Sequence, residues 1–270
     1  MKKIEFLTPI LISLVALTTS KVQAQKLPAT QKESVLAPSN IKIDGKTDEW
    51  DNQFKAYNKS TEIFYTIAND DKNLYLIIQA TRYSIIDKIT GDGITFTIKN
   101  SGDSKTVVPV AITYPIIPKA YRPHILHQLS DTSVNMADAL PGLNKELSAH
   151  AQDIIVTGFD DITDSVISVY NEHGIKVAGL FNMNKALTYE FAIPLKYINQ
   201  LTTNAGELKY NIKVNGLTVN SYNIVINGKA ANAADEKTMA LLNEITSQPG
   251  SKLMDQMSAT DLSGTYKLAK

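Results

Sequence analysis

A short strand, an Asp-Gly turn and an acidic pair before the chain's one tryptophan constrain this fold more than any other feature. The run reads Ile41-Lys42-Ile43-Asp44-Gly45-Lys46-Thr47-Asp48-Glu49-Trp50, and about twenty residues later Asp70-Asp71-Lys72-Asn73 leads into the alternating strand Leu74-Tyr75-Leu76. Turn signals of this kind connect neighbouring antiparallel strands. The opening is therefore typical of an exported β-sandwich, and not of an enzyme with a nucleotide-binding loop.

The N-terminus has the three parts of a signal peptide. A positive start at Lys2 and Lys3 precedes the apolar stretch Phe6–Leu17 and the small-residue cleavage signal Val22-Gln23-Ala24. The apolar stretch is shorter than the roughly 20 residues that span a bilayer, so we expect cleavage and no stable membrane insertion afterwards. The sequence predicts residues 1–24 as a signal peptide and a periplasmic or secreted protein.

Charge and cysteine content limit the partners of the exported chain. The sequence has 27 Lys or Arg and 27 Asp or Glu, and removal of residues 1–24 takes away three lysines and one glutamate, which leaves a net charge of about −2. Such a chain has no broad attraction for a phosphate backbone, so we expect no nucleic-acid partner. Because the sequence has no cysteine, its stability depends on the core and not on disulfides.

Alternating apolar and polar residues predict half-buried antiparallel strands. Ile94, Phe96 and Ile98 alternate with polar neighbours, and residues 208–214 repeat the pattern. Turn signals separate the further candidates Glu62–Ala68, Leu74–Ala80, Thr106–Thr113, Asp153–Phe159, Asp164–Tyr170, Ile175–Leu180, Leu187–Ile193 and Tyr222–Ile226. About ten short strands predict an all-β fold, an antiparallel β-sandwich of the immunoglobulin or jelly-roll kind.

Two stretches interrupt the β pattern. Ser130–Ala151 and Ala233–Ser247 carry apolar residues at helical spacing, which predicts short helical insertions. The first insertion either covers a binding face as a lid or caps one open end of the sandwich. No Pro/Gly/Ser-rich linker divides the rest, so we expect one domain over residues 40–270, preceded by a flexible polar lead-in at residues 25–39.

Four segments, in order along the chain, resemble family 9 carbohydrate-binding modules and their DOMON-like relatives. They are the run from Ile43-Asp44-Gly45 to Trp50, the strand introduced by Asp70-Asp71-Lys72-Asn73, the segment Tyr189-Glu190-Phe191-Ala192-Ile193-Pro194-Leu195 and the closing segment Leu262-Ser263-Gly264-Thr265-Tyr266-Lys267-Leu268. The resemblance implies a non-catalytic sandwich that recognises a sugar or glycan through its loops or one sheet face.

Modules of that family often hold sugar between two tryptophans. Trp50 is the only tryptophan here, and it belongs to the structural run, so we expect it to pack in the core. Tyrosine rings can stack on sugar in place of tryptophan. The predicted ligand-binding residues are Tyr83, Tyr114 and Tyr121 with Arg82 and Arg122 nearby, and the alternative is that these tyrosines only cap the sandwich.

An acidic loop raises the question of a metal. Asp44, Asp48 and Glu49 could supply oxygen ligands to a structural calcium ion, which the resemblance also implies. The alternative is that Asp44 only hydrogen-bonds the backbone of its own turn. The sequence leaves both hypotheses open.

The sequence contains no motif of nucleophilic, zinc-dependent or nucleotide chemistry, and we predict that the protein is not an enzyme. A glycosidase pair of carboxylates cannot be recognised from sequence alone. The second hypothesis for function is an envelope protein that binds another protein through its sandwich. Clustered rings in a groove would favour glycan binding, and a flat apolar patch would favour a protein partner.

Overall fold

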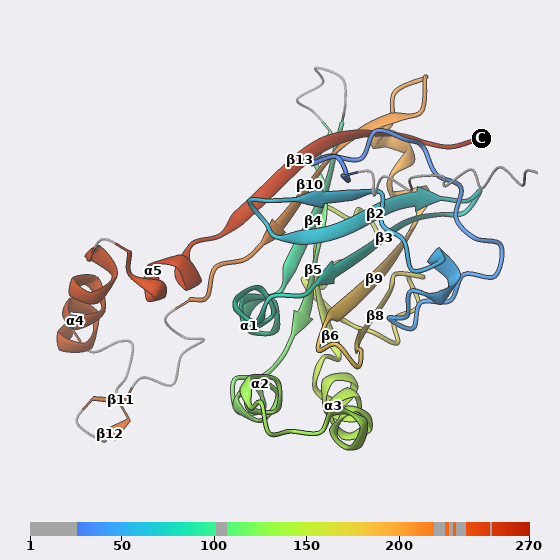
Figure 1. The fold of residues 1–270 in the computed structure, drawn as a ribbon. Helices are drawn as coiled ribbons and strands as arrows, with labels where there is room; N and C mark the ends of the chain where they lie inside the picture. Colours follow the sequence, from blue (N-terminus) through green and yellow to red (C-terminus); the bar gives the residue numbers. More distant parts are fainter. Residues whose placement is uncertain (1–25, 101–106, 219–224, 227–228, 231–235, 249) are drawn as a thin grey trace, which may run out of the picture.

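The computed structural model describes residues 26–100, 107–218, 225–226, 229–230, 236–248 and 250–270. Within them the chain is mostly β, with two antiparallel sheets of five and six strands and a few short helices (Figure 1). The predicted antiparallel β-sandwich with helical insertions is confirmed at this level. The predicted signal peptide lies outside the described residues, as does most of the predicted strand Tyr222–Ile226.

The central strands of the five-stranded sheet are buried on both faces. Its order is β1 (Ala56–Asn58), β2 (Ile63–Asn69), β3 (Asn73–Ala80), β9 (Leu187–Pro194) and β8 (Lys176–Phe181). Strands β2, β3 and β9 are buried at nearly every position, which explains why their sequences are almost continuously apolar.

The six-stranded sheet is buried on one face only. Its order is β13 (Thr260–Lys267), β10 (Glu207–Val214), β4 (Ile94–Asn100), β5 (Val110–Ile116), β6 (Asp153–Thr157) and β7 (Val166–Ser168). In β10 buried residues alternate with partly or fully exposed ones along the whole strand. The apolar side faces the core, and the polar side of the sheet faces solvent.

The main core lies between the two sheets. Tyr65 and Leu76 of the five-stranded sheet belong to the same buried cluster as Phe96 and Tyr210 of the six-stranded sheet. The rings of Tyr65 and Tyr210 meet edge to face with centroids 6.3 Å apart. This packing joins the sheets and predicts that they unfold together.

A smaller core covers the outer face of the five-stranded sheet. Trp50 ends the short helix η1 (Asp48–Trp50) and packs with Tyr75 and Ile77, while Val35 and Ile41 cover the cluster. Trp50 is only 8% exposed, so its predicted place in a core is confirmed.

The described part of the lead-in also packs on the sandwich, which corrects the prediction of a flexible segment at residues 25–39. Leu36 forms a parallel bridge with Asn69, and the side chain of Gln31 is buried. The polar composition that predicted flexibility instead supplies an amide that binds strand β2. The packed structure therefore begins before Asn40.

Five α-helices lie around the sandwich in the described part of the chain: α1 (Tyr83–Asp92), α2 (Arg122–Ser130), α3 (Met136–His150), α4 (Glu236–Ser247) and α5 (Lys252–Met257). Two short 3-10 helices are η2 (Leu195–Tyr197) and η3 (Asn199–Leu201). The helices predicted within Ser130–Ala151 and Ala233–Ser247 are confirmed as α3 and α4. Helices α2 and α3 lie at one end of the sandwich (Figure 1).

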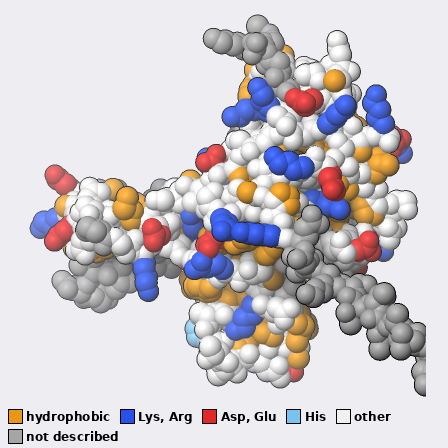
Figure 2. All heavy atoms as spheres, turned by 45° about the horizontal axis from the view of Figure 1, so that its top comes forward, with side chains coloured by type: hydrophobic (Ala, Val, Ile, Leu, Met, Phe, Trp, Pro, Cys, Tyr) orange, Lys and Arg blue, Asp and Glu red, His pale blue; other side chains and the backbone are white. Residues whose placement is uncertain are grey.

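The connection from β10 to β13 carries a projecting arm, by which we mean α4, α5 and the strand pair β11 (Val225–Ile226) and β12 (Lys229–Ala230). Figures 1 and 2 show the arm extending to one side of the sandwich. In the described part of α4 only Thr238 is fully buried, so the helix has few core contacts.

Candidate functional site

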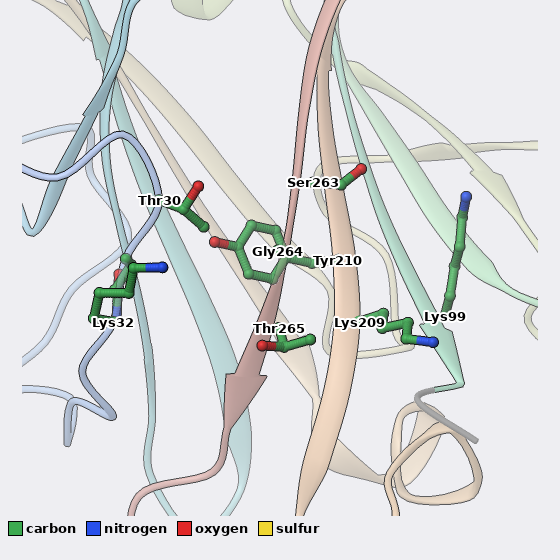
Figure 3. Close-up of a pocket in the computed structure, with 9 residues that line it drawn as sticks. Thr30, Lys32, Lys99, Lys209, Tyr210, Ser263, Gly264 and Thr265 are labelled. Atoms are coloured by element: carbon green, nitrogen blue, oxygen red, sulfur yellow. The ribbon is translucent and has the colours of Figure 1, made fainter.

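A hollow of about 590 Å³ lies over the strands β4, β10 and β13 of the six-stranded sheet. Three lysines and three serine or threonine side chains line it: Lys32, Lys99, Lys209, Thr30, Ser263 and Thr265 (Figure 3). Gln31, Tyr210 and Gly264 complete the lining. We call this the β13 hollow.

Most of these side chains belong to the solvent-facing residues of three adjacent strands. Lys209 of β10 is the direct partner of Lys99 on β4 and of Thr265 on β13, so the three residues form one row across the open face of the sheet. Like charges directly opposite on neighbouring strands lower stability. The row therefore includes an unfavourable pair that the fold itself does not need.

A second row runs parallel to the first, one step along the strands. Asn211 of β10 is the partner of Ser263 on β13, and its side-chain amide donates to the Ser263 hydroxyl over 3.0 Å. The same amide donates to a carboxylate oxygen of Asp261 over 2.6 Å. This row fixes the orientation of Ser263 beside the hollow.

Gly264 brings the backbone of β13 close to the ring of Tyr210. A Cβ atom at Gly264 would lie 2.5 Å from the Tyr210 hydroxyl oxygen, so no other residue fits there without displacement of the ring. Tyr210 is the partner of Gly264 across the strands, and its hydroxyl lies 3.0 Å from that of Tyr65. Burial, followed by the hydrogen bond with Tyr65, raises the pKa of Tyr210.

The wall opposite the sheet is residues 30–32, which we call the strap. The Gln31 side chain holds the strap to β2: its amide donates to the Ile67 carbonyl over 2.8 Å and its oxygen accepts from the Ile67 N–H over 2.7 Å. The backbone N–H of Gln31 donates to the Tyr65 hydroxyl over 3.1 Å. A buried polar network thus links the strap with the floor of the hollow, and Figure 3 shows Tyr210 reaching toward Thr30.

No Asp or Glu is among the lining residues of the hollow. Within the described part of the chain, Lys32, Lys99 and Lys209 form no ion pair. The carboxylates of β10 and β13 on the same sheet face occupy other rows: Glu207 lies opposite Lys267, and Asp261 lies opposite Lys213. The hollow is a positively charged, hydroxyl-lined surface.

The structure does not gather the sequence-predicted ligand-binding residues into one site. Tyr114 is 3% exposed, donates its hydroxyl to the Ala151 carbonyl over 3.1 Å and packs in the core, so its predicted ligand role is wrong. It lies on the inward phase of β5, which the sequence prediction had ended at Thr113. Burial raises its pKa.

The other four predicted residues belong to the helical end. Tyr83 and Tyr121 are each 44% exposed, and the Tyr121 ring stacks on His150. Arg82 pairs with Glu62, while Arg122 is buried 4.0 Å from Asp87. Arg122 therefore joins α1 to α2, and its predicted role as an accessible ligand contact is wrong.

The predicted calcium ligands also have other roles. One oxygen of Asp44 accepts from the Lys46 N–H over 3.0 Å, and the other pairs with the Lys46 ammonium over 2.8 Å. Glu49 has one buried oxygen without a hydrogen-bond partner, yet calcium takes six to eight oxygens. Among the described residues no group of three or more His, Asp or Glu could hold a metal, so Asp44, Asp48 and Glu49 do not form the predicted site.

Glu190 connects two of the segments that carry the resemblance, its own and the run from Ile43 to Trp50. One of its oxygens accepts from the Trp50 indole over 2.8 Å, and the other accepts from the backbone N–H groups of Asp44 and Gly45 over 2.9 and 2.8 Å. Burial raises the pKa of Glu190 to about 7 against the lowering effect of these donors. The buried carboxylate anchors the Asp-Gly turn and the tryptophan to strand β9.

Sequence reasoning missed the β13 hollow. Lys99 and Lys209 occupy the polar phase of predicted strands, and that signal was available. The sequence does not reveal that the two lysines are cross-strand partners, because β4 and β10 are separated by more than 100 residues of chain.

Comparisons with family models, curated proteins and solved structures found no match for this chain. The class that fold and hollow define is a β-sandwich with a basic, hydroxyl-lined site on one sheet face. In the described part of the chain no helix combines the length and apolarity needed to cross a bilayer.

Proposed function

We propose that this protein is an exported, non-catalytic binding module, similar to family 9 carbohydrate-binding modules, that recognises a glycan in the β13 hollow. The observation that carries the proposal is the row of hydroxyl and ammonium groups around a hollow of about 590 Å³ on an open sheet face. The residues of the resemblance support the same class of fold, since Glu190 binds both Gly45 and Trp50.

The lining suits a ligand rich in hydroxyl groups. Thr30, Ser263 and Thr265 can each donate one hydrogen bond and accept others, and the lysines donate. The ring of Tyr210 is only 1% exposed, so recognition depends on polar contacts and not on the stacking that a tryptophan clamp provides. A flat sheet face also leaves room for a chain of sugar units.

A double substitution tests the location of the site. S263A/T265A removes two hydroxyls from the hollow, and we expect glycan affinity measured by calorimetry to fall about tenfold or more, because two bound polar groups lose their partners. T157A is the matched control: Thr157 is an exposed threonine on β6 of the same sheet, outside the hollow. Equal affinity of all three proteins for a bound glycan would move the site elsewhere.

A second hollow gives that result a defined alternative. The rings of Tyr57 and Phe64 lie 4.5 Å apart and border a hollow of about 310 Å³ near Leu27. If Y57A abolishes glycan binding and S263A/T265A does not, this aromatic hollow is the site.

The arm favours a protein partner as the second candidate function. Leu241 and Ile245, four residues apart on α4, are each 38% exposed, and Met254 of α5 is 53% exposed. Apolar side chains that share one exposed helix face can contribute to an interaction surface when they form a continuous patch. Under this hypothesis the wild-type chain binds an envelope protein and L241E/I245E does not. The unfolding midpoint is the same for both.

A further inference from the structure

We propose that the ligand of the β13 hollow is an anionic glycan, one that carries carboxylate or sulfate groups along a polyhydroxylated chain. This inference rests on the proposed glycan-binding function and specifies the chemistry of its ligand. It starts from the distribution of charge around the hollow.

The lysine pair on β4 and β10 is the first argument. Lys99 and Lys209 are direct cross-strand partners on the open face, and both are exposed. Two ammonium groups in this arrangement repel each other, and an anion bound between them removes the repulsion. A neutral sugar would leave the repulsion in place.

Lys32 supplies a third positive charge from the other side of β13. Figure 3 shows Lys32 on the strap at one side of the strand and Lys99 and Lys209 at the other, with Thr265 between them. The ligand surface thus alternates charged donors with hydroxyl groups. Ammonium groups at intervals match a polymer that carries a charge on its repeating units.

The dimensions of the row argue against a small inorganic ion as the ligand. Lys99 and Thr265 belong to strands on either side of β10, so their backbones lie roughly 10 Å apart. An oligosaccharide can contact the whole row at once, whereas a single sulfate leaves part of its ammonium and hydroxyl groups without a ligand. The hydroxyls of Ser263 and Thr265 would bind the sugar, and the lysines its acidic groups.

The rest of the sheet face supplies an internal reference. Lys213 lies on the same strand and face as Lys209 but opposite Asp261, and it is not part of the hollow. Lys213 therefore has the same chemistry as Lys209 without the same role. A general attraction of polyanions to this face would use Lys213 as well as Lys209.

Calorimetric titration of the purified protein with matched ligands tests the inference. The probes are oligogalacturonate and its methyl ester of equal length, and dextran sulfate and dextran. We expect at least one charged probe to bind at least tenfold more tightly than its neutral partner, and K99Q and K209Q each to weaken it about tenfold or more. K213Q should leave the affinity within about twofold, and circular dichroism verifies that each variant is folded. The two charged probes distinguish a carboxylate ligand from a sulfate ligand.

Three results would overturn the inference. If neutral probes bind as tightly as charged ones and S263A/T265A weakens them, the glycan function stands and its anionic character is wrong. If no probe binds, both proposals fail. If K213Q weakens binding as much as K209Q, or an oligodeoxythymidylate of equal charge binds equally well, the face attracts polyanions without recognising a glycan.

Discussion

Glu190 makes the buried junction beneath the Asp-Gly turn sensitive to pH. Its pKa is raised by burial to about 7 from an ordinary value of 4.5, so between these values the folded protein retains a proton that the unfolded chain has lost. The contribution of Glu190 to the free energy of unfolding has its largest value below pH 4.5 and is lost as the pH rises through 7. We expect a decrease on the order of 3 kcal/mol, measured by urea unfolding between pH 4.5 and 7.5.

The pH effect has two internal checks. The pKa of Glu190 is directly observable by carbon NMR of its carboxyl group, and W50F should raise it further because the indole donor is lost. Asp44, Asp70 and Asp131 have lowered pKa values, so their contributions change only at more acidic pH. A Glu190 titration near its ordinary value would contradict this account.

Gln31 provides a second prediction for a single residue. Q31A leaves the N–H and carbonyl of Ile67 without their side-chain partners, and we expect the free energy of unfolding to fall by about 2–4 kcal/mol. The matched control is Q79A. Gln79 lies on β3 of the sheet that Gln31 binds, and its side chain donates a hydrogen bond to the Thr188 hydroxyl. Thermal unfolding midpoints compare the two, and equal losses would mean that the strap is not held by Gln31.

At the scale of strands, the row of Lys99 and Lys209 predicts that stability and binding change in opposite directions. K209T removes the repulsion and adds a β-branched residue to a strand, so we expect the unfolding midpoint to rise by about 1–2 °C while the affinity for an anionic glycan falls. K213T instead removes a lysine opposite Asp261 and should not raise the midpoint. A lower unfolding midpoint for K209T would show that repulsion between Lys99 and Lys209 does not destabilise the sheet.

The elements also show what sequence reasoning could achieve. Local patterns predict two strands almost to the residue: turn signals bound Leu187–Ile193, and apolar alternation marks residues 208–214. Helix α1 is not among the predicted elements, although Ile85, Ile86 and Ile89 have helical spacing. The predicted ligand-binding site rests on residue type alone, whereas the burial of Tyr114 and Arg122 depends on long-range packing.

At the scale of the whole molecule, the arm is separable from the sandwich in its contacts. Strands β10 and β13 pair in register from Glu207 with Lys267 to Val214 with Thr260, so the sheet continues on both sides of the arm without interruption. The connection is held to the body at its base, where the Thr218 N–H donates to the Asp92 carboxylate and the Lys88 ammonium donates to the Ser258 carbonyl. The arm is therefore an addition to one hairpin of the sandwich.

This separation predicts the effect of removing α4. Replacement of residues 219–250 by a short Gly-Ser linker keeps α5 and both strands, and a change in loop length alone alters the free energy of unfolding by less than about 1 kcal/mol. We expect the unfolding midpoint to stay within a few degrees and glycan affinity in the β13 hollow to be unchanged, whereas binding to a protein partner through Leu241 and Ile245 is lost. Calorimetry and thermal unfolding of the shortened chain measure both. A protein that fails to fold would show that the arm stabilises the sandwich, and lost glycan affinity in a folded protein would show that the arm contributes to the site.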